Sequence, residues 1–263
     1  MPPERPALVI HVPHASAFIP PDVRPQFIVS DADLDAEVLK LTDWYTDDLF
    51  SLPDTVAQTL RFPVSRVVID PERFLDDSVE PMADRGMGVV YTKTCDGAPL
   101  RASLSEADRQ TLIDRLYTPH HREFEDAVAR CLREHDRCLI IDAHSFPDRP
   151  LPCHLEQYGS AASPDVCIGT DKFHTSSGLA EQGRAAYEEQ GYTVHMNQPF
   201  AGSIVPLRYY RHDRRVSSFM VELNRRLYMH EPTGKRLQVF ASVRDQNLAA
   251  LRKVIRRWES DQF

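Results

Sequence analysis

The chain has 263 residues, of which 42% are hydrophobic and 27% are charged, values that are ordinary for a soluble globular protein. A formal net charge of −8 argues against a general nucleic-acid binder, because such a protein needs a basic stripe. No apolar run approaches the length of a membrane span, and the N-terminal run is too short for a signal peptide, so no membrane partner is expected. The 5 cysteines are scattered and include no CxxC pair, which favours a reduced, cytoplasmic protein over a disulfide framework or a cysteine-ligated zinc site.

Strand-length apolar runs alternate with helical patterns along the chain. The runs lie at residues 7–13, 55–62, 64–73, 89–94, 138–141, 165–170, 192–196 and 217–223, the third of them ending in a polar turn. Apolar residues at helical spacing predict helices from 31 or 33 to 49, from 105 onward with a break or kink near 117–118, from 176 to 190 and from 234 to 259. This alternation predicts an α/β fold with a mostly parallel sheet. No repeat or low-complexity linker divides residues 1–263, which favours a single domain.

The most informative stretch is the apolar run at 138–141, which ends abruptly in Asp142-Ala143-His144-Ser145. In a mostly parallel sheet, the ligand site lies just beyond the carboxyl ends of the strands. Asp142 and His144 are two residues apart on a strand, so their side chains point to the same face. A histidine at that end can bind a metal, with a nearby carboxylate orienting its ring. The alternative is a strand-end histidine that only hydrogen-bonds its neighbours.

Two other strand ends carry residues of the same kind. His14 follows the first strand, whereas His11 lies within that strand, where a structural role is favoured. Glu222 lies inside the last apolar run, where burying an unpartnered carboxylate costs several kcal/mol of desolvation. A glutamate at this position therefore suggests a functional role. His14, His144 and Glu222 lie close together only if the three strands that carry them are neighbours in the sheet. Two histidines, a carboxylate and a water make an open zinc site, and a separate glutamate beside it can serve as general base.

Arginines flank the polar turn at the end of the 64–73 run. Arg66 and Arg73 lie on either side of Asp70, where a guanidinium fork can hold a carboxylate ligand. The alternative is an ordinary surface ion pair, which contributes little. A long loop is predicted at 75–101, and a second probable site loop at 197–203. His120 and His121 are adjacent in one helix, so at most one of them can face a site.

Along most of its length the sequence resembles the N-formylglutamate amidohydrolase family. Each matching piece is short, but their order is specific. The pieces are Val12–Ala15 with Ile19-Pro20, Thr42–Trp44 with Leu49, Ser65–Asp70 with Arg73, Tyr117 with Pro119–His121, Asp142–Ser145, Pro199–Gly202 with Arg208, and Glu222-Leu223 with Tyr228-Met229. That family is similar in fold to the zinc carboxypeptidases, which implies a three-layer αβα sandwich around a mixed sheet.

The resemblance also implies a set of site residues. In carboxypeptidases a zinc-binding histidine precedes serine at a strand end, as His144 does here, and a catalytic glutamate precedes leucine, as Glu222 does. The first-ligand pattern of carboxypeptidases, His-x-x-Glu, is not kept, because Ala17 lies three residues after His14. Asp43 is taken as the third ligand because the resemblance covers it. His14, Asp43 and His144 would hold one divalent cation, with Zn²⁺ as first choice, although imidazole and carboxylate suit several ions.

In the implied reaction, the metal polarises a formyl carbonyl and lowers the pKa of its water to about 7, while Glu222 moves the proton. Arg66, Arg73 and Arg208 would clamp the carboxylates of a small acidic N-acyl amino acid, most simply N-formylglutamate, which gives formate and glutamate at the end of histidine breakdown. The family usually has Leu-Asn-Arg where this chain has Pro71-Glu72-Arg73, and an inward Glu72 would be unfavourable beside an acidic substrate.

Two other functions remain open at this stage. One is a carboxypeptidase or N-acyl amino-acid hydrolase that uses the same zinc site on another acyl group. The other is a non-catalytic protein that binds a small anion through the histidines and arginines, although such a protein gains nothing from desolvating Glu222. The sequence does not indicate an oligomeric state.

Overall fold

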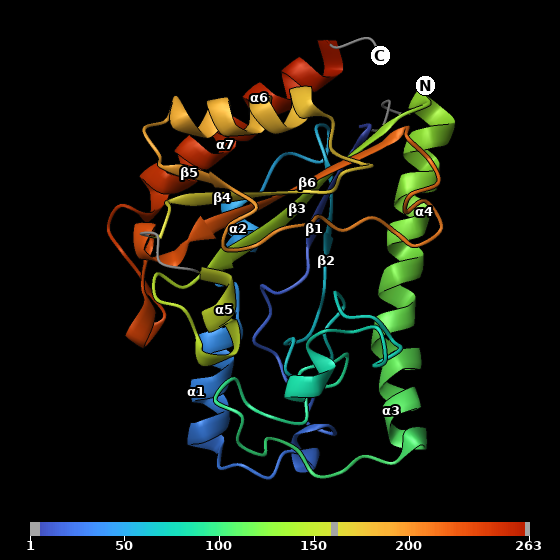
Figure 1. The fold of residues 1–263 in the computed structure, drawn as a ribbon, viewed down its shortest axis with the longest axis vertical. Helices are drawn as coiled ribbons and strands as arrows, with labels where there is room; N and C mark the ends of the chain where they lie inside the picture. Colours follow the sequence, from blue (N-terminus) through green and yellow to red (C-terminus); the bar gives the residue numbers. More distant parts are fainter. Residues whose placement is uncertain (1–5, 159–162, 261–263) are drawn as a thin grey trace.

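The computed structural model describes residues 6–158 and 163–260. Its main sheet has 6 strands in the order β2-β1-β3-β6-β4-β5 (Figure 1). They are β1 (Leu8–Val12), β2 (Gln58–Arg61), β3 (Cys138–Phe146), β4 (Val166–Thr170), β5 (Val194–Met196) and β6 (Val216–Asn224). The neighbours β2, β1, β3 and β6 are parallel, whereas β4 is antiparallel to β6. The predicted α/β fold with a mostly parallel, mixed sheet is therefore confirmed.

Helices cover both faces of the sheet and complete three layers (Figure 1). Leu139 and Ile141 of β3 belong to the apolar cluster that includes residues of α6 (Ser177–Glu188) and α7 (Phe240–Ser260). Cys138 and Ile140 belong to the cluster on the other face, against α4 (Thr118–His135). Because side chains alternate along a strand, the next two residues on the α4 side are Asp142 and His144.

The helix predicted from 31 or 33 to 49 is broken in the structure. Ser30 caps α1 (Asp31–Leu41), and a short α2 (Thr46–Leu49) follows after Tyr45, whose φ of 66° is left-handed. The break frees Asp43 from the helix, and its backbone N–H donates to the carbonyl oxygen of His14 at 2.9 Å. Sequence spacing alone did not show this break, because the apolar residues continue at helical intervals across it.

The break or kink predicted near 117–118 takes the form of a change of helix type rather than an interruption. Ser105 caps α3 (Glu106–Leu112) as expected, and a π-helical turn at Ile113–Tyr117 joins α3 to α4, which begins at Thr118. Pro119 lies just after this turn and lacks the N–H that a regular α-helix would use there. A π-helical turn commonly marks such an adjustment within a longer helix.

Two predicted strands, at 64–73 and 89–94, are not part of the sheet. Their apolar residues, including Val67, Ile69 and Tyr91, are buried in a second cluster with residues of α1 and of the turns between 62 and 100. An apolar run reveals burial but not backbone geometry, so this error follows from the signal itself. The second cluster holds the turn at residues 70–73 against the carboxyl ends of β1 and β3.

The remaining elements are short. A turn of helix, α5 (Leu155–Tyr158), follows β3, and a small hairpin pairs β7 (Met229–His230) with β8 (Lys235–Arg236). The C-terminal helix predicted from 234 therefore begins only at Phe240. Among the described residues, no helix has both the length and the apolar character that a membrane crossing requires.

Candidate active site

Three neighbouring strands bring His14, His144 and Glu222 to one place. His14 follows β1, His144 lies near the end of β3, and Glu222 pairs with His144 in the register between β3 and β6. All three side chains line a single cavity of about 680 Å³. The convergence that sequence reasoning required is present, because β1, β3 and β6 are adjacent.

His14 is held by one nitrogen and leaves the other free. Its Nε2 makes a 2.8 Å hydrogen bond with Asp70 Oδ1, whereas its buried Nδ1 has no hydrogen-bond partner among the described residues. Burial alone would raise the pKa of Asp70, but Arg66 and His14 hold that pKa well below its usual value. The ionised Asp70 therefore fixes the His14 ring with its Nδ1 toward the cavity.

His144 repeats this arrangement with its nitrogens exchanged. Its Nδ1 makes a 3.0 Å hydrogen bond with Asp43 Oδ2, and within residues 6–158 and 163–260 its buried Nε2 has no hydrogen-bond partner. Burial would lower the pKa of His144, but the nearby carboxylates of Glu72 and Asp142 raise it well above the ordinary value. In each of the two histidines, a carboxylate therefore fixes one ring nitrogen, and the other ring nitrogen is available to bind a metal ion.

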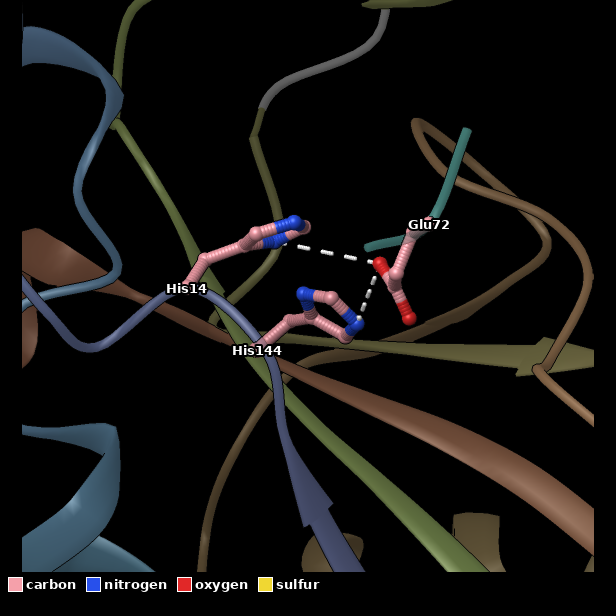
Figure 2. Close-up of side chains that lie close together, drawn as sticks. All are labelled: His14, Glu72 and His144. Carbon is pink, nitrogen blue, oxygen red and sulfur yellow. Dashed lines mark ion pairs between the residues drawn. The ribbon is translucent and has the colours of Figure 1, made fainter. Parts of the chain in front are cut away.

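Glu72 comes from the turn after residue 70 and lies opposite the two histidines, as Figure 2 shows. Its Oε2 lies 3.2 Å from His144 Nε2 and 3.8 Å from His14 Nδ1. Within the described part of the chain, neither carboxylate oxygen of Glu72 accepts a hydrogen bond, and its ion-pair partners are histidines alone. Two imidazole nitrogens and one carboxylate oxygen therefore form a group that could hold a metal ion.

Asp43 lies beside Nδ1 of His144, whereas Glu72 lies beside Nε2 of the same ring. Besides accepting from His144 Nδ1, it accepts a 2.9 Å hydrogen bond from Arg225 Nη2 through its other oxygen. Burial would raise the pKa of Asp43, but His14 and His144 lower it below the ordinary value. Asp43 Oδ2 is 3.6 Å from His14 Nδ1, so it touches both histidines, but both of its oxygens already have partners.

Glu222 has an unpartnered oxygen beside this group. Its Oε2 is buried and makes no hydrogen bond within the part of the chain that the structure describes, and burial raises the pKa of the Glu222 carboxyl to about 8. Nearby Asp43 contributes to the rise, whereas His144 opposes it. A carboxyl whose pKa lies near neutrality can both accept and return a proton.

The predicted arginines do not all reach the cavity. Arg66 and Arg73 line it, and Arg66 donates to Asp70 Oδ2 at 2.8 Å. The buried Nε of Arg73 has no hydrogen-bond partner, and it lies 3.8 Å from Glu80 Oε1. Arg208 is exposed and is not among the residues that line the cavity. Arg225 was missed at the sequence level, although it follows the Glu222-Leu223-Asn224 strand end directly.

The remaining histidines near the site divide between two environments. His11 makes hydrogen bonds of 3.0 Å with Asp142 Oδ1 and of 2.9 Å with His120 Nε2. Burial, with a smaller electrostatic contribution from the neighbouring His11, lowers the pKa of His120 to about 2. His121 instead lines the cavity and donates through Nε2 to the carbonyl oxygen of Pro71 at 2.8 Å.

The predicted site loop closes another side of the cavity. Residues 199–205 line it, and the backbone N–H of Ile204 donates to Asp142 Oδ2 at 3.3 Å. The loop passes so close to β4 that a Cβ at Gly169 would lie 2.3 Å from the carbonyl oxygen of Gly202. Glycine is therefore required at position 169 for the loop to take this path.

Comparisons with known proteins point to one family. The family model described as N-formylglutamate amidohydrolase matches residues 6–229. The N-formylglutamate deformylase of Pseudomonas aeruginosa is 29% identical over 233 residues, which span 85% of this chain and 82% of that protein. The crystal structure of N-formylglutamate amidohydrolase from Ralstonia eutropha matches with a TM-score of 0.82 and 26% identity, covering 97% of this chain and 96% of that chain. A gene product from Agrobacterium tumefaciens, 20% identical with a TM-score of 0.65 over 95% of this chain and 92% of that chain, shares the fold.

Proposed function

We propose a function on the premise that this chain belongs to the N-formylglutamate amidohydrolase family, whose model matches residues 6–229. We infer that the protein is a metal-dependent hydrolase that cleaves the formyl amide of an N-formyl amino acid, with N-formyl-L-glutamate as the first candidate substrate. The observation that carries this proposal is a pair of buried, unpartnered imidazole nitrogens, on His14 and His144, that face one carboxylate of Glu72. A further unpartnered carboxylate, Glu222, lines the same cavity.

The donor set fits a divalent cation such as Zn²⁺. Ligands about 2.0–2.1 Å from a tetrahedral zinc lie roughly 3.3 Å from one another. The separations of Glu72 Oε2 from His144 Nε2, 3.2 Å, and from His14 Nδ1, 3.8 Å, bracket that value. We therefore propose Glu72, rather than Asp43, as the third ligand, and assign Asp43 the orientation of His144. An inward Glu72 was expected to be unfavourable beside an acidic substrate, but a role as a metal ligand would explain its orientation.

Glu222 is the proposed general base and acid. A divalent ion held at this site would supply Lewis-acid polarisation of the amide carbonyl and would make water easier to deprotonate. Glu222 would take the proton of the attacking water and then deliver it to the nitrogen of the leaving amine as the C–N bond breaks. The balance is one water and one formamide consumed, and one formate and one protonated amine released, because the proton of the nascent formic acid also passes to the amine.

Arg73 is the proposed anchor for a substrate carboxylate. Its buried Nε has no hydrogen-bond partner among the described residues, and its ion pairs with Asp70, at 3.9 Å, and Glu80, at 3.8 Å, are longer than hydrogen bonds. Arg66, by contrast, donates to Asp70 at 2.8 Å. A guanidinium without close hydrogen bonds can bind a substrate carboxylate through charge-assisted hydrogen bonds. Arg66 would then add positive charge and keep Asp70 in place.

We expect Arg73→Ala to lower kcat/KM for N-formylglutamate by about 10- to 100-fold, mainly through KM, because a hydrogen bond to a charged group is worth about 1.5–3 kcal/mol. Steady-state kinetics across a range of substrate concentrations measure this effect. Arg208→Ala is the matched comparison, because Arg208 is exposed and outside the cavity lining. An equal rise in KM in both variants would indicate that Arg208 also binds a substrate carboxylate, as the sequence analysis predicted.

The function is tested by metal analysis of the purified protein together with formate release from N-formylglutamate before and after chelation. We expect bound zinc or a similar ion, and formate release that stops on chelation and returns when metal is restored. Metal without formate release would discard this substrate, and a panel of formyl, acetyl and peptide substrates would then separate the deformylase from the wider N-acyl hydrolase. Absence of both metal and activity would refute the proposal and favour the anion binder.

A further inference from the structure

A second group of possible metal ligands lies beside the group formed by His14, Glu72 and His144, and the two groups share Glu72. His11 Nδ1 lies 3.0 Å from Asp142 Oδ1 and 3.6 Å from Glu72 Oε1, and the three residues form a further group that could hold a metal ion. His11 and Asp142 are directly paired in the register between β1 and β3, so their backbones fix this contact. His11 and Asp142 are buried within the sheet, and Glu72 reaches them from the turn at residues 70–73.

Glu72 presents a different oxygen to each group. Its Oε2 faces His14 and His144, whereas its Oε1 faces His11. A carboxylate with this orientation can bridge two cations, which is a recurring arrangement in hydrolases that use two metals. We propose that Glu72 is such a bridge, and that a second divalent cation binds beside the first, held by His11, Glu72 and Asp142. This inference rests on the metal site of the proposed function.

No basic side chain pairs with the carboxylates of the second group. Among the described residues, the ion-pair partners of Glu72 and of Asp142 are histidines, with no arginine or lysine on either carboxylate. Arg225, which also lines the cavity, is paired with Asp43 instead. A cation can therefore take the place that an arginine or lysine would otherwise have beside these two buried carboxylates.

The surroundings of His11 fit a metal ligand. Its ring is stacked on Phe124 with 4.8 Å between ring centroids, and its Nε2 makes the 2.9 Å hydrogen bond with His120. If Nε2–H donates to His120, then Nδ1 is left with its lone pair toward Asp142 and Glu72, as ligation requires. The competing explanation is a His11 that simply donates Nδ1–H to Asp142 and never binds metal.

The test is metal stoichiometry after full chelation and reloading with excess Zn²⁺ followed by desalting. We expect two equivalents in the unmodified protein and one in both His11→Leu and Asp142→Asn. The exposed His212 gives the matched control, and His212→Gln should keep two. Loading with Mn²⁺ adds an independent readout, because a carboxylate-bridged pair gives an exchange-coupled electron paramagnetic resonance spectrum that a single ion cannot give.

The outcomes separate this inference from the proposed function. No bound metal in the unmodified protein would overturn both. One equivalent, lost in His14→Ala but kept in His11→Leu, would overturn the second site alone and support the hydrogen-bonded His11. Two equivalents that persist in both His11→Leu and Asp142→Asn would place the second ion elsewhere and would also overturn the inference. If His11→Leu fails to fold, then the stoichiometry and the Mn²⁺ spectrum of the unmodified protein still decide the matter.

Discussion

Glu222→Gln is expected to keep its metal and to lower kcat by about 10²- to 10⁴-fold, the usual contribution of a positioned general base. Glutamine has nearly the same shape as glutamate but cannot take a proton from water. The loss should therefore fall on kcat, with little change in metal content or in KM. The expected stability of the variant is no lower, because the buried carboxyl of Glu222 has an oxygen without a hydrogen bond, and glutamine carries no charge to desolvate.

Glu37→Gln is the matched control for this experiment. Glu37 is also a buried glutamate whose pKa is raised by burial, but it is outside the cavity lining and accepts a hydrogen bond from the backbone N–H of Cys95. We expect kcat close to that of the unmodified protein. Metal analysis and steady-state kinetics on both variants complete the comparison. Near-normal turnover in Glu222→Gln would remove Glu222 from its proposed role.

The strand ends were predictable because two simple rules apply to them. Alternation along a strand places Asp142 and His144 on one face, and parallel strands carry their ligands at the carboxyl ends. These rules also single out His14 and Glu222, and the adjacency of β1, β3 and β6 then brings all of these side chains together. What the rules could not supply was that adjacency, since strand order is not encoded in local periodicity.

The rules for strands could not predict the role of Glu72, which lies in a turn. Glu72 lies in a turn whose position depends on the second apolar cluster, and the apolar run before it was interpreted as a strand of the sheet. A turn has no periodicity, so the sequence shows that Glu72 is charged but not that it faces His14 and His144. The departure from the family's usual asparagine was the available signal, and it was interpreted as a difficulty for the substrate rather than as the ligand that we now propose.

Glu72→Gln is expected to weaken zinc binding far more than Asp43→Asn does. Loss of a residue that orients a metal-bound histidine typically costs 10- to 100-fold in affinity, and loss of a charged direct ligand should exceed that range. Among the described residues, no hydrogen bond holds the side chain of Glu72 in place without an ion, whereas the Asp43 carboxylate is bound to both His144 and Arg225. Zinc affinity measured by competition with a chelator, with activity followed in parallel, tests the order of the two effects.

The stability of the metal-free variants gives a second, independent comparison. Asp43→Asn leaves Arg225 buried without its carboxylate, so the variant should unfold at a lower temperature even without metal, by the cost of an uncompensated charge. Glu72→Gln removes a carboxylate whose ion-pair partners are histidines, so its metal-free stability should change little while its affinity falls. The opposite pattern, with normal affinity in Glu72→Gln and its collapse in Asp43→Asn, would restore Asp43 as the third ligand and leave Glu72 without a role in binding the ion.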